Sequence, residues 1–202
     1  MKKHHGPHPG IVAIVYSLLL ALTVISYNIP GATRINALFQ FGAAIPVGIF
    51  TAAVTSRLHF LGVNVTGVSI ALYGGIAASV LLILSGLSTW ASTQPDIAND
   101  TPVVHALQHL GFGCGGYAFI VMLGLMMAGI SVPSLFGHYN PRWLVWLGLV
   151  LAGFAELSTL GLIVPQLVWL LPVVRIPSVI WMIGTGFTLR KTREGGGVSA
   201  AA

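Results

Sequence analysis

Residues 101–141, TPVVHALQHLGFGCGGYAFIVMLGLMMAGISVPSLFGHYNP, contain no Asp, Glu, Lys or Arg. A helix needs about 20 apolar residues to cross the hydrocarbon core of a bilayer, so this stretch is long enough to form a membrane span. Other uncharged stretches lie on both sides of it, at 11–33, 35–56, 60–95 and 143–155. The sequence therefore predicts a polytopic membrane protein.

The composition excludes a water-soluble fold. Hydrophobic residues make up 55% of the chain and charged residues only 6%, whereas soluble domains contain about 25% charged residues. The formal net charge is +5, but the basic residues lie near the ends of the uncharged stretches and form no continuous stripe. Anionic lipid explains them better than nucleic acid does. The expected partner is therefore the lipid bilayer, and no nucleic acid is expected.

The fold predicted from this pattern is an all-α bundle of six transmembrane helices. It forms a single domain at 10–190, between a tail at 1–9 and a disordered tail at 191–202. Pro, Gly and charged residues mark the expected helix ends. The helices are expected at 10–29, 36–56, 65–89, 102–130, 143–164 and 167–189.

The junction before the last helix has an alternative interpretation. Pro165, Pro172 and Pro177 lie close together there, and proline interrupts helical hydrogen bonding. Residues 165–176 could therefore form a broken or interfacial segment that precedes a shorter final helix.

The basic residues predict the orientation. Seven of them fall on one side of the membrane and only Arg34 falls on the other; the seven are Lys2, Lys3, Arg57, Arg142, Arg190, Lys191 and Arg193. Loops rich in Lys and Arg stay in the cytoplasm. Both termini are therefore predicted to be cytoplasmic.

Small residues recur at four-residue spacing within the expected spans. The pairs are Ala44 and Gly48, Ala71 and Gly75, Gly111 and Gly115, and Gly148 and Ala152. Such pairs let helix backbones approach closely in a membrane. Packing within the chain is the simplest interpretation, and contact with a second copy or with another membrane protein is the alternative.

Ionisable residues inside the spans are the best candidates for function, because a charge in the bilayer is costly. At about 1.5 Å per residue, Glu156 lies about 20 Å from the inner interface and Arg175 about 22 Å from it. These residues belong to consecutive antiparallel helices. The sequence therefore predicts that they meet as an ion pair or as a hydrogen-bonded pair.

Three more polar residues are expected near the same depth. His109 lies about 10 Å below the outer interface, counted from Pro102, His105 lies one turn above it, and Gln40 falls slightly higher than His109. His105, His109, Glu156, Arg175 and Gln40 thus form a predicted polar cluster in the outer half of the bundle.

The leading hypothesis is a non-enzymatic protein that binds a partner or a small ligand through this cluster. A purely structural polar clamp is an alternative. A proton-linked transporter or ion-conducting protein that uses Glu156 and His109 is another. An enzyme is least favoured, because the sequence offers no nucleophile and base pair.

A divalent metal site at the outer face is a further alternative. His105 and His109 share one helical face, and Asp96 and Asp100 precede them. The pattern does not supply a fixed third ligand. Cys114 is the only cysteine, so neither an intrachain disulfide nor a thiolate cluster can form, and no cofactor is predicted.

The second half of the chain, from Val103 to Arg193, resembles a bacterial family of small inner-membrane proteins defined as a domain of unknown function. The resemblance rests on the run NPRWLVWLG at 140–148, on Leu171-Pro172, and on the helix around Trp181 with its basic end. It implies a small helical protein of the bacterial cytoplasmic membrane. It implies no mechanism.

Overall fold

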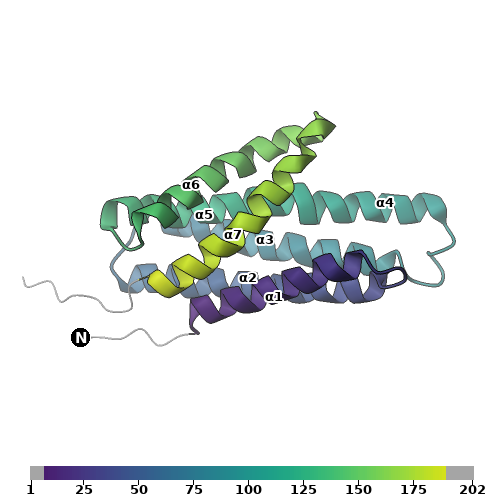
Figure 1. The fold of residues 1–202 in the computed structure, drawn as a ribbon, viewed down its shortest axis with the longest axis horizontal. Coiled ribbons are helices and arrows are strands. Elements are labelled where there is room, and N and C mark those ends of the chain that lie inside the picture. The colour runs from purple at the N-terminus through teal and green to yellow at the C-terminus, as the bar shows by residue number, and fades with distance from the viewer. Residues whose placement is uncertain (1–6, 190–202) are drawn as a thin grey trace, which may run out of the picture.

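A computed structural model describes residues 7–189 as a bundle of long helices without strands (Figure 1). Six helical spans are long and apolar enough to cross a membrane. They are Pro9–Tyr27, Thr33–Phe60, Thr66–Ala91, Thr101–Gly137, Arg142–Leu162 and Pro165–Thr188. The all-α membrane bundle of six helices is confirmed. The predicted tails fall largely at 1–6 and 190–202, outside the described residues.

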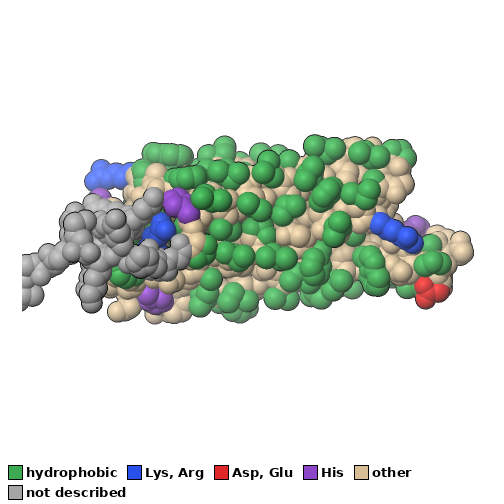
Figure 2. Space-filling view, turned by 90° about the horizontal axis from the view of Figure 1, so that it is seen from below, with side chains coloured by type: hydrophobic (Ala, Val, Ile, Leu, Met, Phe, Trp, Pro, Cys, Tyr) green, Lys and Arg blue, Asp and Glu red, His purple; other side chains and the backbone are tan. Residues whose placement is uncertain are grey.

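The surface fits a protein surrounded by lipid. Figure 2 shows hydrophobic side chains along the whole length of the visible face, with basic and acidic side chains gathered near its two ends. Large apolar residues are exposed on every span, among them Leu18, Leu38 and Ile176. Exposed apolar area of this extent is expected where lipid replaces water as the solvent.

The first three helices pack in chain order. Helix α1 (Pro9–Tyr27) lies against α2 (Thr33–Phe60), and α2 lies against α3 (Thr66–Ala91). At one end of the bundle, Arg34 donates hydrogen bonds to the carbonyl and the hydroxyl of Thr93. This contact joins the first turn of α2 to the segment that follows α3, and we call this side of the bundle the far end.

The fourth span is one continuous helix with an irregular middle. It comprises α4 (Thr101–Phe112), a π-helical stretch at Gly113–Ala118 and α5 (Phe119–Gly137). We call Gly113–Ala118 the π segment. The span has 37 residues, so it is about 55 Å long, against a hydrocarbon core of about 30 Å. Helix α4 accordingly extends past its neighbours at the far end (Figure 1).

The last two spans form a hairpin. Helix α6 (Arg142–Leu157) continues as a 3-10 turn at Ser158–Leu162, and a second 3-10 turn at Pro165–Trp169 leads into α7 (Leu170–Thr188). We call 158–169 the hairpin apex. Val164 is extended, as expected for a residue that precedes proline. The helix is thus interrupted at 158–169, earlier than the alternative at 165–176, and it resumes at Leu170.

Helix α7 closes the bundle by packing against both α6 and α1. The ring centroids of His8 and Phe187 lie 5.1 Å apart, and a Cβ on Gly186 would lie 2.6 Å from the Cα of Gly10. Both ends of the described chain therefore lie at the same end of the bundle, which we call the terminal end.

The predicted small-residue pairs face other helices of the same chain. A Cβ on Gly75 of α3 would meet the side chain of Thr51 of α2, and one on Gly48 of α2 would lie 3.3 Å from Ser79 of α3. Ala71 packs against Gly129. These faces are thus filled by intrachain contacts, and the idea that an oligomer forms through them gains no support.

Candidate functional site

The structure separates the five residues of the predicted polar cluster. His105 and His109 of α4 are exposed, as is Glu156 near the end of α6. Gln40 of α2 and Arg175 of α7 are half-buried, and both reach the π segment. Only these two of the five are therefore brought together.

The predicted ion pair between Glu156 and Arg175 does not form. Arg175 instead donates a hydrogen bond from Nη1 to the carbonyl of Gly115, at 3.1 Å. Helix α6 runs antiparallel to α5, with Ala155 beside Gly124, so Glu156 lies near the level of Leu123. That level is eight residues, or about 12 Å, from Gly115.

The prediction failed because it counted depth separately along each helix. It treated the last two spans as straight rods that begin at a common interface. In the structure α7 crosses the bundle obliquely (Figure 1), and the Arg175 side chain reaches Gly115. The real register is set by contacts along α6, where Gly148 lies beside Ser131 and Gly161 beside Tyr117.

The two histidines lie farther out than the sequence predicted. His109 is six residues, or about 9 Å, beyond Gly115 toward the far end. Among residues 7–189, no three His, Cys, Asp or Glu side chains lie close enough to hold a metal ion. Asp100 serves a different purpose, because its carboxylate accepts the Val103 N–H and caps α4.

In the π segment the Gly115 carbonyl lacks the backbone N–H that it would accept from in a regular α-helix. The N–H of Phe119 bonds to the carbonyls of Cys114 and Gly116, and it passes over Gly115, its acceptor in a regular α-helix. The Gly115 carbonyl accepts from Arg175 instead. The guanidinium Cζ also lies 4.9 Å from the centre of the Phe119 ring, a cation–π distance.

Gln40 and Ser85 make a second contact, at the end of α4 and the start of the π segment. Gln40 Nε2 donates to Ser85 Oγ at 2.6 Å, and Ser85 Oγ donates to the carbonyl of Gly111 at 2.6 Å. A Cβ on Gly115 would lie 2.8 Å from Gln40 Nε2 and would also meet the Ser85 side chain. Glycine at 115 therefore lets α2 and α3 approach the π segment.

Tyr16 of α1 is the third contributor. Its side chain is fully buried, and its hydroxyl makes no hydrogen bond of good geometry among residues 7–189. The hydroxyl lies beside the Arg175 guanidinium, within hydrogen-bonding reach of it. We define the interior polar cluster as the side chains of Tyr16, Gln40, Ser85 and Arg175 together with the carbonyls of Gly111 and Gly115.

Sequence reasoning missed Tyr16 and Ser85. Both lie in apolar spans that contain several other hydroxyl residues, and nothing in their spacing distinguishes them. The available signal was the glycine-rich run from Gly111 to Gly116, because irregular helix often occurs where glycine allows close approach.

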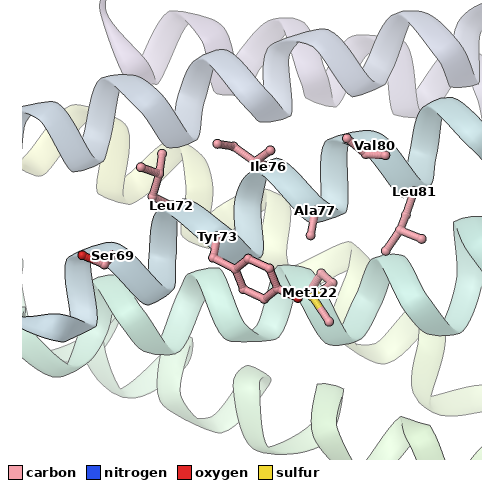
Figure 3. A pocket seen from close by; sticks show the side chains of 8 residues that line it. All are labelled: Ser69, Leu72, Tyr73, Ile76, Ala77, Val80, Leu81 and Met122. Carbon is pink, nitrogen blue, oxygen red and sulfur yellow. The ribbon is translucent and has the colours of Figure 1, made fainter.

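Two grooves lie outside the interior polar cluster. The larger one, of about 570 Å³, lies on α3 beside Met122 of α5 (Figure 3). Apart from Ser69 and Tyr73 its lining is aliphatic or thioether, which suits a lipid acyl chain. A smaller apolar groove of about 230 Å³ lies between the π segment and the hairpin apex.

The comparisons with known proteins give no family. No family model matches the chain, and neither a curated protein nor a solved structure shows significant similarity to it. The chemistry of the interior polar cluster is therefore the basis for a functional proposal.

Proposed function

We propose that this chain is a non-enzymatic, multi-pass protein of the bacterial cytoplasmic membrane that binds a small ligand at the interior polar cluster. One observation carries the proposal. Polar side chains from α1, α2, α3 and α7 converge on the π segment, where the fourth span departs from α-helical hydrogen bonding.

The membrane setting makes this convergence informative. A charged or polar group among transmembrane helices is costly, and such groups mark ligand or ion sites far more often than elsewhere. Irregular backbone is tolerated at that depth only where protein or water covers it. π-helical turns are likewise frequent at functional sites.

The chemical groups of the cluster suit binding. The guanidinium, the phenol and the amide have N–H or O–H groups left to donate, whereas the Ser85 hydroxyl already donates to Gly111. The guanidinium is held by Gly115 and by the Phe119 ring. A fixed set of donors orients a ligand at a low entropic cost. The same groups supply no nucleophile with an adjacent base, which favours a binding protein over an enzyme.

The basic residues support the proposed orientation. Arg57 and Arg142 belong to the terminal end, and Arg34 belongs to the far end. With the basic tail residues added, the positive-inside rule assigns the terminal end to the cytoplasm. The interior polar cluster would then lie in the half of the bundle that faces away from the cytoplasm.

Proton-linked transport through Glu156 and His109 has less support. Both side chains are exposed on the outside of the bundle, and they lie at levels about 21 Å apart along α4 and α5. A proton relay needs groups within reach of one another or of shared water. We therefore favour ligand binding at Arg175 over transport through these residues.

Cysteine accessibility tests the proposal. Gln40 and Ser79 are both half-buried at the α2–α3 interface; Gln40 bonds to Ser85 in the cluster, while Ser79 donates to the Ala44 carbonyl about 6 Å nearer the terminal end. Gln40→Cys and Ser79→Cys would be compared in a Cys114→Ala background, reconstituted in bilayers and treated with water-soluble methanethiosulfonate reagents.

A ligand site must be reachable from water. We expect Gln40→Cys to react several-fold faster than Ser79→Cys, and to react from the far end. Equal, slow reaction at both positions would mean that the cluster is sealed and acts as a structural clamp.

A further inference from the structure

The interior polar cluster carries a positive charge that no residue of the described chain neutralises. We propose that its ligand has an anionic oxygen group, a carboxylate or a phosphate, which binds between Arg175 and Tyr16. This inference rests on the proposed function and adds the chemical class of the ligand.

Arg175 has more donors than partners. A guanidinium carries five N–H groups and stays charged in proteins, yet within residues 7–189 Arg175 makes one hydrogen bond of good geometry, to Gly115, and has the Tyr16 hydroxyl beside it. Its Nε is buried and has no acceptor there. An unpaired buried donor is costly, and the cost is larger when the group is charged.

No carboxylate is available to act as its counter-ion. The described acidic residues are Asp96, Asp100 and Glu156, and none of them bonds to Arg175. Asp100 caps α4, and Glu156 lies about 12 Å away by register. A water molecule could accept a hydrogen bond from Nε, but it would leave the charge unbalanced. A bound anion would accept a hydrogen bond from Nε and would also balance the charge.

Tyr16 of α1, a helix that packs against α7, supplies a second donor beside Arg175. Its hydroxyl is buried beside Arg175, and its own O–H has no acceptor in the described part of the chain. Even if the phenol oxygen accepts from the guanidinium, its own O–H still needs an acceptor. An anionic oxygen accepts from both groups, and such charge-assisted bonds are the strong ones.

The guanidinium is also held in place before any ligand arrives. Nη1 is fixed by the Gly115 carbonyl, and the Phe119 ring lies 4.9 Å from Cζ. These contacts occupy one edge and one face of the group and leave the Nε edge without a partner. Arginine is well suited to carboxylate and phosphate because its planar fork matches their geometry.

Arg57 provides an instructive contrast. It is also buried with nitrogens that lack partners, but it lies three residues before the end of α2. The end of a span is the ordinary place for a basic residue at a membrane boundary, so its position alone accounts for Arg57. Arg175 lies well inside its span, so the same explanation does not cover it.

The test uses the charge of the labelling reagent as a probe. Gln40→Cys in the Cys114→Ala background would be treated with the anionic sulfonatoethyl and the cationic trimethylammonioethyl methanethiosulfonates. Each rate would be divided by the rate of that reagent with free mercaptoethanol. We expect the anionic reagent to be favoured, and Arg175→Met to lower this preference by about tenfold, as a nearby unit charge predicts.

Protection experiments identify the source of the anion. Labelling would be repeated with inorganic phosphate, with decanoate against decanol, and in phosphatidylglycerol against phosphatidylcholine nanodiscs. Protection by phosphate or decanoate supports a free solute, and protection by phosphatidylglycerol alone supports a lipid headgroup. Tyr16→Phe, which keeps the buried ring, should weaken protection several-fold and provides a second variant if Arg175→Met does not fold.

Different results would overturn different statements. If Gln40→Cys reacts no faster than Ser79→Cys, the proposed function fails and this inference fails with it. If Gln40→Cys reacts readily but shows no preference for the anionic reagent, or if no anionic probe protects it, only the anionic ligand is refuted. A preference that Arg175→Met leaves unchanged refutes it as well.

Discussion

Helices α3 and α5 pack through their backbones, whereas α7 meets the π segment through a charged side chain. At the first interface Gly74 and Gly129 bring backbone atoms together, and a Cβ at either position would come within 2.8 Å of the partner backbone. At the second, Arg175 spans the gap to Gly115 with one hydrogen bond. Both interfaces depend on glycine, but for different reasons.

The difference shows which contacts serve the fold. In a bilayer, close packing of small residues is the main source of helix association, and the α3–α5 interface leaves no polar group unpaired. The interior polar cluster leaves an Arg N–H and a Tyr O–H without acceptors in the described chain. A contact that costs stability in this way is expected where function requires it.

The largest expected effect comes from the α3–α5 interface. In Gly129→Ala the new Cβ would lie 2.6 Å from the Ala71 nitrogen and from the Gly67 carbonyl oxygen. Because backbone cannot move aside as a side chain can, we expect a loss of about 2–4 kcal/mol in the free energy of unfolding. Thermal unfolding in detergent would measure it.

Gly153→Ala is the matched control for this substitution. A Cβ at 153 meets no atom within 4 Å, so the change should stabilise α6 by about 0.5–1 kcal/mol. A neutral Gly129→Ala would show that α3 and α5 pack less tightly than described and would remove the contrast between the two interfaces.

A smaller effect is expected at the π segment. In Gly115→Ala the Cβ would press on Gln40 and Ser85, whose side chains can partly move aside, so we expect a loss of about 1–3 kcal/mol. Gly113→Ala, two residues earlier in the same segment, meets nothing within 4 Å and should not lower the melting temperature. Equal melting temperatures for the two variants would contradict the close approach at Gly115.

Removal of the hydroxyl of Ser85 should cost less again. Ser85→Ala leaves the Gly111 carbonyl and the Gln40 amide without their partner, and hydrogen bonds between membrane helices contribute about 0.6 kcal/mol on average. We expect a loss of about 0.5–1.5 kcal/mol. In a double-mutant cycle with Gln40→Ala, additive losses would refute the chain from Gln40 through Ser85 to Gly111.

The smallest change in stability is expected at Arg175. Arg175→Met gives up one hydrogen bond and the cation–π contact, together worth about 1–3 kcal/mol, but it also removes an unneutralised guanidinium whose burial costs a similar amount or more. The melting temperature should therefore stay near that of the unmodified protein. A fall larger than that of Gly115→Ala would identify Arg175 as a structural clamp.

The fold could be predicted from the sequence because its signal is local. Each span can be recognised from a run of uncharged residues long enough to cross a bilayer, without knowledge of its contacts with other spans. The same reasoning located the interruption near Pro165, although the helix stops at Ser158 and resumes at Leu170. It also identified Gln40 and Arg175 as members of a polar cluster.

The partners of those two residues were decided by the tertiary structure. Depth counted along each helix matched Arg175 to Glu156, but Arg175 bonds to Gly115, whose level is about 12 Å along α5 from that of Glu156. Tyr16, Ser85 and the Gly115 carbonyl come from three other spans. Sequence determines which segments enter the membrane because burial in lipid is a property of each segment alone. Helix packing decides which polar groups meet, because that depends on how all of the segments fit together.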